Sequence, residues 1–349
     1  MQALNPPDSF RIAIAGVSHS HVKIFHRSNF LSRMDLVGVS EPDPVQLKAF
    51  GELHDLPADR LFDDVGRMLD TTKPEAVCAF GSIREHLAVV EAAALRGIDV
   101  MVEKPLAISV ADARHMAALA REHGIRVLTN YETTWYASTQ HAIAEVDAGK
   151  LGDIRKVVVH DGHKGPIEIG CKPEFVEWLA DPQHSGGGAL PDFGCYGANL
   201  VTRLLNGRRP RRVMAVTHQF KPDLYPKVED DATILVSYDT CEVIIQASWT
   251  WPIARKDIEI YASDGQMIAH DGRTVSTQMI DTPNREVHET LPLLLQPYDD
   301  PFAHLAAVVR GEIELAPNDL AELDNNVLVV EILEAARMSA EQGRPVDLT

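Results

Sequence analysis

The sequence predicts an α/β fold in two parts: an N-terminal Rossmann domain built on a doubly wound parallel sheet, and a C-terminal α+β domain with an open-faced, mostly antiparallel sheet. Two observations support this prediction. The first third of the chain alternates short apolar runs with helical periods, which is typical of a parallel sheet covered by helices on both faces. Beyond about Gly149, longer alternating runs follow one another without helices, which is typical of antiparallel strands.

The N-terminal domain is expected over residues 1–130, with the carboxyl ends of its strands forming one ligand-binding edge. Its last helix has Ser109 as N-cap and ends at Gly124. Strands are expected over 11–17, 35–42, 75–80, 99–105 and 125–131, and helices from about Val22 and over 44–53, 84–97 and 109–124.

The C-terminal domain is expected over residues 131–349, with tight turns at Asp264-Gly265 and Asp271-Gly272. One helix should follow the segment "GGGALPDFGCYG", and a long one should end at Gly343. Strands are expected over 154–163, 211–220, 231–240 and 241–251 and within 257–275.

Composition excludes several functions. The chain of 349 residues is 45% hydrophobic and 24% charged, as in a soluble globular protein, and its formal charge of -18 disfavours nucleic acid and anionic membranes as partners. Four scattered cysteines predict free thiols in a reducing compartment. Without an apolar leader or a run of roughly 18 apolar residues, we expect a cytoplasmic protein.

The turn after the first expected strand, "GVSHSH", predicts a degenerate phosphate-binding loop. Gly16 supplies the tight turn, and Ser18 replaces the second glycine of the G-x-G-x-x-G pattern with a small hydroxyl donor. His19 would donate to a pyrophosphate or face the mouth of the site. His21 replaces the third glycine, so we expect the first helix to stand slightly further from the sheet. Glu41 ends the second strand and would accept both ribose hydroxyls, which favours NAD, with NADP as the alternative.

Two further motifs predict the catalytic residues. Lys104, in "VEKP", ends a strand at the ligand-binding edge, because the following proline biases it away from helix. On the helix after three consecutive glycines, Asp192 and Tyr196 are four residues apart and share one face. Taken singly, each motif is also compatible with a purely structural role.

Together these motifs resemble the Gfo/Idh/MocA oxidoreductases, the family of glucose-fructose oxidoreductase and inositol dehydrogenase. The triplet "EKP" matches the family's motif of that sequence, "GGGALPDFGCYGANLVTRLL" matches its G-G-G-x-L-x-D-x-G-x-[HY] segment, and the ending "RMSAEQGRPVDL" is similar to its C-terminal helix and tail. Tyr196 stands where many members have histidine, as in the glucose-fructose oxidoreductase, dihydrodiol and xylose dehydrogenase branches. Asn199 stands where inositol-dehydrogenase-like members often have aspartate.

The resemblance implies an NAD(P)-dependent oxidoreductase acting on a sugar, a polyol or a related hydroxy compound. It makes Lys104 the catalytic lysine, Asp192 the residue that orients the substrate, and Tyr196 the acid/base. It also implies a homodimer or homotetramer assembled through the open sheet. The expected cofactor contacts are Gly16, Ser18, His19, Glu41, Gly81, Ser82, Glu103, Lys104 and Asn130, the last of them to the nicotinamide carboxamide.

The chemistry agrees with these roles. An ordinary tyrosine titrates near 10, and an ammonium within about 4 to 6 Å favours its phenolate, so we expect Lys104 to lower the pKa of Tyr196. Asp192 would accept a second substrate hydroxyl, which suits a sugar or polyol. We expect substrate specificity to lie in the loops 164–172 and 221–230.

Three alternatives stay open. One is a hydrolase that uses NAD for transient oxidation of a glycoside, and another is a sensor that binds NAD without turnover. The third is a metallohydrolase built on His19, His21 and His26; we expect no metal, because a carboxylate or histidine that would complete such a site is not evident nearby.

Overall fold

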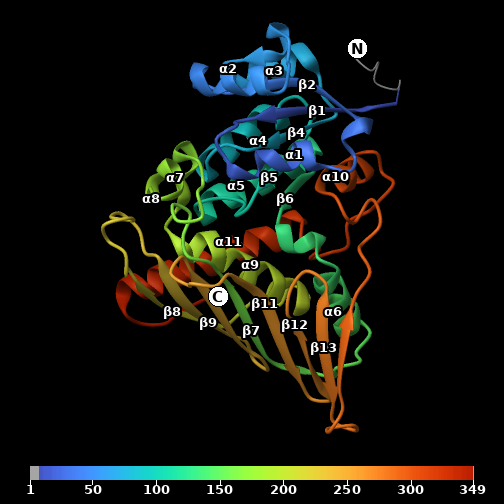
Figure 1. Cartoon of the computed structure of the whole chain (residues 1–349), viewed down its shortest axis with the longest axis vertical. Helices are drawn as coiled ribbons and strands as arrows, with labels where there is room; N and C mark the ends of the chain where they lie inside the picture. Colours follow the sequence, from blue (N-terminus) through green and yellow to red (C-terminus); the bar gives the residue numbers. More distant parts are fainter. Residues whose placement is uncertain (1–7, 349) are drawn as a thin grey trace.

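The computed structural model describes residues 8–348, which form two sheets with α9 and α11 between them (Figure 1). The first sheet is parallel throughout, in the order β3-β2-β1-β4-β5-β6, as expected of a Rossmann domain. Its strands are β1 (Phe10–Ala15), β2 (Met34–Ser40), β3 (Leu61–Phe62), β4 (Ala76–Ala79), β5 (Asp99–Glu103) and β6 (Val127–Asn130).

Helices cover both faces of this sheet, which confirms the doubly wound prediction. One face packs against α3 (Val65–Thr72), α4 (His86–Ala94) and α5 (Val110–His123). The other packs against α1 (Ile24–Arg27), α2 (Pro44–Leu53) and α10 (Pro301–Val309). Ser109 caps α5 by accepting the N–H of Asp112, and Gly124 ends it in the left-handed conformation, as predicted.

The helical stretch expected from about Val22 is present but short. The chain forms a 3₁₀ turn, η1 (Ser20–Lys23), and then the single turn of α1. The ring of His19 caps this turn, because its Nδ1 accepts the N–H of His21 at 3.0 Å. Such a short segment has little helix dipole to offer a pyrophosphate, so anion binding here must rely on backbone N–H groups and side chains.

The second sheet has nine strands, in the order β14-β13-β12-β11-β7-β10-β9-β8-β15. It is mostly antiparallel, as predicted; the pairing of β7 with β10 is parallel. Its strands are β7 (Ile154–Gly162), β8 (Arg212–His218), β9 (Asp231–Ser237), β10 (Glu242–Ser248), β11 (Arg255–Ala262), β12 (Gly265–Ala269), β13 (Thr274–Met279), β14 (Glu286–Thr290) and β15 (Val346–Asp347).

One face of this sheet packs against α9 (Ala189–Leu204) and α11 (Leu323–Gln342), the two helices that the sequence predicts for this domain. The structure adds α6 (Ala137–Asp147), α7 (Pro173–Leu179) and α8 (Pro182–Ser185). The glycines before α9 are needed for close approach, because a Cβ on Gly188 would lie 1.8 Å from the carbonyl oxygen of Glu229.

The C-terminal part of the chain returns to the first domain. Phe302 and Leu305 of α10 are fully buried in the core that also contains β1. The N–H of Thr129, in the edge strand β6, donates to the carbonyl of Ala321 at 3.0 Å. The two domains are therefore joined by packed structure as well as by the chain connection after β6. Within residues 8–348, every helix is too short or too polar to span a lipid bilayer.

Candidate active site

The predicted catalytic lysine and aspartate meet at the junction of the two domains. Lys104 directly follows β5, and its Nζ forms an ion pair with Oδ1 of Asp192 and donates to the Asp192 carbonyl at 3.0 Å. The other carboxylate oxygen of Asp192 accepts Nε1–H of Trp249 at 2.9 Å. Burial opposes both charges, yet the pair raises the pKa of Lys104 and lowers the pKa of Asp192. Both groups are therefore charged at neutral pH.

Tyr196 lies one helical turn beyond Asp192 on α9, with its ring centroid 5.2 Å from Nζ of Lys104. The structure thus brings together the three predicted catalytic residues. The expected pKa shift of Tyr196 is wrong, however. Burial and the nearby carboxylates of Glu132 and Asp161 raise the pKa of Tyr196 well above its ordinary value.

Sequence reasoning missed a second lysine at this site. Lys256 of β11 lies with Nζ 3.9 Å from the ring centroid of Tyr196, which is closer than Lys104. Its ammonium donates to Oε2 of Glu132 at 2.9 Å and is 3.6 Å from Oδ2 of Asp161. No sequence motif marks Lys256 or Asp161. Their proximity follows from the register of the neighbouring strands β7 and β11, which pairs the two residues.

Gly16 makes the tight turn after β1 and packs against Gly81, which follows β4. Gly16 has a φ of +78°, and a Cβ there would lie 2.5 Å from the backbone nitrogen of Gly81. Both glycines line a cavity of about 170 Å³ at the carboxyl ends of β1 and β4. Because glycines have no side chain, a nucleotide in this cavity could approach the backbone closely.

Glu41 lies at the end of β2 as expected, but its carboxylate already has backbone partners. One oxygen accepts the N–H of Val17 and the other accepts the N–H of Asp43, both at 3.0 Å. Burial raises its pKa. Glu41 therefore fixes the phosphate turn, and a carboxylate with about four acceptor positions retains capacity for ribose hydroxyls.

The predicted contacts on the nicotinamide side form one hydrogen-bonded chain. Glu103 and Asn130 are paired neighbours at the ends of β5 and β6. One oxygen of Glu103 accepts Nδ2–H of Asn130 at 2.8 Å, and the other lies 2.9 Å from Nδ1 of His21. Asn130 in turn accepts Nε1–H of Trp135 at 3.0 Å. Asn130 thus orients Glu103, and its predicted contact to the carboxamide stays a prediction.

This arrangement also gives His21 a partner. Its side chain is 28% exposed and bonds to Glu103. The expectation that His21 moves the first helix away from the sheet stays a prediction. His19 is 2% exposed and lies under Phe175 and Trp178, with ring centroids 4.9 and 5.5 Å away. Burial lowers the pKa of His19, so its imidazole is neutral at neutral pH.

Two smaller predictions concern Ser82, in the segment after β4, and Ser18, in the turn after β1. Ser82 is 3% exposed, and both its N–H and its hydroxyl donate to Glu85 as part of a capping box, so its contact to a cofactor stays a prediction. Ser18 is half-buried in the turn after β1.

The metal alternative also changes. Of the three histidines proposed as metal ligands, His26 does not group with the other two. Its ring stacks on that of His54, with the ring centroids 3.5 Å apart. His19 and His21 do converge with Glu103, with ligand atoms all within 4.8 Å of one another. The statement that a completing carboxylate is not evident nearby is therefore wrong, because β5 brings Glu103 to the histidines.

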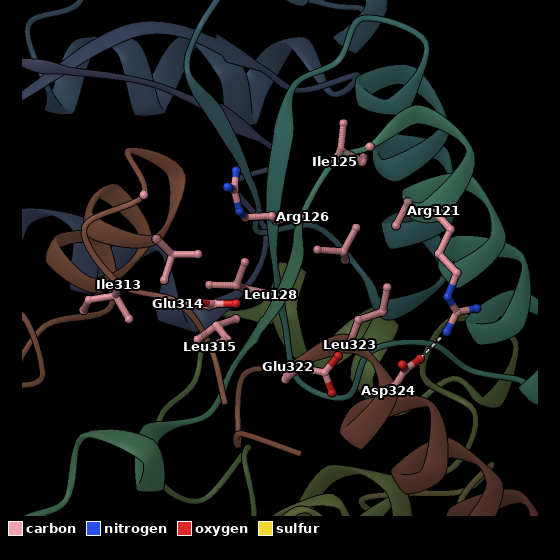
Figure 2. Close-up of a pocket in the computed structure, with 15 residues that line it drawn as sticks. Arg121, Ile125, Arg126, Leu128, Ile313, Glu314, Leu315, Glu322, Leu323 and Asp324 are labelled. Carbon is pink, nitrogen blue, oxygen red and sulfur yellow. Dashed lines mark hydrogen bonds and ion pairs between the residues drawn. The ribbon is translucent and has the colours of Figure 1, made fainter. Parts of the chain in front are cut away.

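Another cavity, of about 640 Å³, lies beside β6 between α5, the segment after α10 and the start of α11 (Figure 2). Arg121 and Asp324 form an ion pair across part of it. Its lining includes none of the predicted catalytic or cofactor-binding residues. The carboxyl edge of the first sheet, facing α9, remains the candidate active site.

A Rossmann domain with a bare dinucleotide turn, joined to a buried Lys-Asp-Tyr group, defines the class of dinucleotide-dependent oxidoreductases. The chain belongs to the Gfo/Idh/MocA family: residues 10–131 match its "Oxidoreductase family, NAD-binding Rossmann fold" domain, and residues 139–268 match its C-terminal domain.

The chain is similar to several characterised relatives. It is 24% identical over 226 residues to trans-1,2-dihydrobenzene-1,2-diol dehydrogenase of Sus scrofa, a match covering 63% of each chain. The enzyme of Xenopus tropicalis is 28% identical over 182 residues, covering 52% of this chain and 51% of that one. The matches thus span about half to two thirds of these relatives.

Solved structures share the whole fold. An aldose-aldose oxidoreductase of Caulobacter crescentus complexed with glycerol superimposes with a TM-score of 0.81 at 23% identity, covering 97% of this chain and 100% of that one. An inositol dehydrogenase homolog of Azotobacter vinelandii complexed with NAD+ superimposes with a TM-score of 0.83 at 21% identity, covering 98% of each. At these identities the likeness establishes the fold.

Proposed function

We propose that this protein is an NAD-dependent dehydrogenase that transfers hydride between the cofactor and a secondary hydroxyl of a sugar, polyol or related compound. The observation that supports this most directly is the group formed by Lys104, Asp192 and Tyr196 at the carboxyl edge of the Rossmann sheet. The named relatives support the substrate class, since they act on a diol and an aldose or were crystallised with glycerol.

Each residue of this group has a distinct role in the proposal. When bound, NAD supplies a nicotinamide ring that accepts hydride from carbon. Tyr196 holds the hydroxyl proton: its raised pKa suits the neutral phenol that donates a proton when a carbonyl is reduced. Lys104 places a positive charge where the substrate oxygen becomes an alkoxide. Asp192 fixes that ammonium and keeps acceptor capacity for a second substrate hydroxyl.

The acidic surroundings of the dinucleotide cavity support NAD rather than NADP. Ser40, Asp63, Asp64 and Glu85 line this cavity, and Glu41 lies beside it at the end of β2. Carboxylates at this position repel the 2'-phosphate of NADP and accept ribose hydroxyls.

The test is NAD reduction with a panel of sugars and polyols. We expect Lys104→Ala and Tyr196→Phe to abolish turnover while circular dichroism stays unchanged. Tyr298→Phe, at a half-exposed tyrosine, is the matched control and should be fully active. Variants of Lys104 and Tyr196 as active as the wild type would overturn the site assignment.

Product analysis separates the alternatives. Cleavage of a glycoside without net NADH would identify a hydrolase that uses NAD transiently. Tight NAD binding with no turnover of any substrate would identify a sensor.

We also propose a homodimer or homotetramer assembled through the open face of the second sheet, where Met214 and Val216 of β8 are 38% and 49% exposed. Light scattering after gel filtration tests this. The four cysteines are free, in agreement with the expected cytoplasmic location.

A further inference from the structure

Lys256 lies over the aromatic face of Tyr196, on the strand of the second domain that is nearest to the active site. Its Nζ is 3.9 Å from the ring centroid, compared with 5.2 Å for Nζ of Lys104. A cation at this distance from a tyrosine ring is attracted by the neutral ring and more strongly by the phenolate.

Two carboxylates hold Lys256 in this position. Glu132, in the segment that follows β6, accepts the ammonium proton of Lys256 at 2.9 Å. Tyr136 donates its hydroxyl to the other oxygen of Glu132 at 2.8 Å. Asp161 lies 3.6 Å away on β7. The ammonium is therefore fixed rather than free to leave the ring.

Burial and the carboxylates around Tyr196 oppose its ionisation, and the ammonium of Lys256 acts in the opposite direction. The carboxylates of Glu132, Asp161 and Asp192 all disfavour a phenolate. Both ammonium groups are paired with carboxylates, and Nζ of Lys256 is nearer to the ring centroid than Nζ of Lys104. The ionisable groups that face Tyr196 are Lys104, Tyr131, Glu132, Asp161, Asp192, Cys195 and Lys256, with His163 behind Phe193.

We propose that Lys256 is a positioning residue for Tyr196, whose ammonium stabilises the tyrosinate that accepts the substrate proton. The inference rests on the proposed dehydrogenase function. In the oxidative direction the substrate O–H and C–H bonds break, the proton passes to Oη of Tyr196, and the hydride passes to C4 of the nicotinamide. The alcohol is oxidised and NAD is reduced, and Lys256 forms no covalent bond.

The test compares Lys256→Met with Lys256→Arg in the pH dependence of kcat/KM for the oxidative direction. Because an adjacent opposite charge shifts a pKa by about 1 to 3 units, we expect Lys256→Met to move the rising limb to higher pH by at least about one unit. Its kcat/KM at neutral pH should fall by roughly tenfold or more, with NAD affinity unchanged. Lys256→Arg, which retains the charge, should return the midpoint close to that of the wild type.

Lys150→Met is the matched control. Lys150 is exposed, lies outside the site, and forms an ion pair with Glu145 in which the two charged groups are 2.6 Å apart. It should leave both the profile and the rate unchanged. A role for Lys256 in packing alone predicts that Lys256→Met loses activity equally at every pH. That uniform loss, or an unchanged midpoint, would overturn the proposal.

A second measurement needs no substrate. The ultraviolet absorbance of tyrosinate, taken as the difference between each protein and its Tyr196→Phe counterpart, follows the ionisation of Tyr196 alone. We expect this titration to move to higher pH in Lys256→Met. If no sugar reduces NAD but the shift appears, the dehydrogenase function fails and the action of Lys256 on Tyr196 stands. If turnover is observed without the shift, only the role of Lys256 fails.

Discussion

Asp161 makes the stability of this protein depend on pH near neutrality, and its replacement by asparagine should remove that dependence. The residue is 1% exposed, and burial, opposed by Lys256, raises its pKa to about 7 from 3.8. The folded protein therefore binds this proton more tightly than the unfolded chain, and the resulting stability is present at low pH and lost as pH rises through about 7. With one pKa unit worth about 1.4 kcal/mol, the wild type should lose roughly 2 to 3 kcal/mol of unfolding free energy between pH 5 and pH 8 through this group.

Urea unfolding of the wild type and Asp161→Asn at both pH values, followed by circular dichroism, measures this loss. The difference in unfolding free energy between pH 5 and pH 8 should be smaller in the variant by that amount. The same substitution at Asp239, whose side chain is 78% exposed, controls for the chemistry of the exchange and should leave the difference unchanged. An Asp161→Asn protein with the same pH dependence as the wild type would refute the reasoning.

Three further predictions concern the site. Trp249→Phe removes a hydrogen bond to the charged Asp192, worth about 1.5 to 3 kcal/mol, so steady-state kinetics should show kcat/KM lower by roughly tenfold to a hundredfold with NAD affinity retained. Gly16→Ala should weaken NADH binding, measured by fluorescence, at least about tenfold, because its Cβ would meet backbone at 2.5 Å in addition to a left-handed strain of about 1 to 2 kcal/mol. Gly97→Ala has a similar φ of +63° with open space around it, and equal weakening there would contradict this explanation. Dialysis against EDTA should leave the rate unchanged, since both oxygens of Glu103 already have protein partners, whereas activity restored by added Zn²⁺ would identify a metal enzyme.

The helices and strands could be predicted because the residues that start and end each one are close together in the sequence. The Asp43-Pro44 start of α2 and the Ser109 cap and Gly124 end of α5 depend only on neighbouring residues. The shortness of the helix at Val22 could not be predicted, for the opposite reason. There His19 caps a 3₁₀ turn and His21 reaches across to β5, a contact between segments far apart in sequence.

The site divides in the same way. Lys104, Asp192 and Tyr196 stand in recognisable motifs, so their residues could be named before their geometry was known. Lys256 stands at the start of an ordinary strand, and its importance depends on the register that pairs it with Asp161 and on Glu132, which is far from it in the sequence. The electrostatics could not be predicted either, because the pKa of Tyr196 depends on its burial and on the carboxylates of Glu132 and Asp161, which only the fold brings near it.

The return of α10 to the Rossmann core limits how this enzyme can be engineered. Exchanging residues 10–131 for the cofactor domain of a relative would remove the surface that buries Phe302 and the strand edge that bonds Ala321. A chimera that preserves this packing must therefore take residues 300–330 from the same parent as residues 10–131. The sequence that folds as the Rossmann domain is thus discontinuous in the chain.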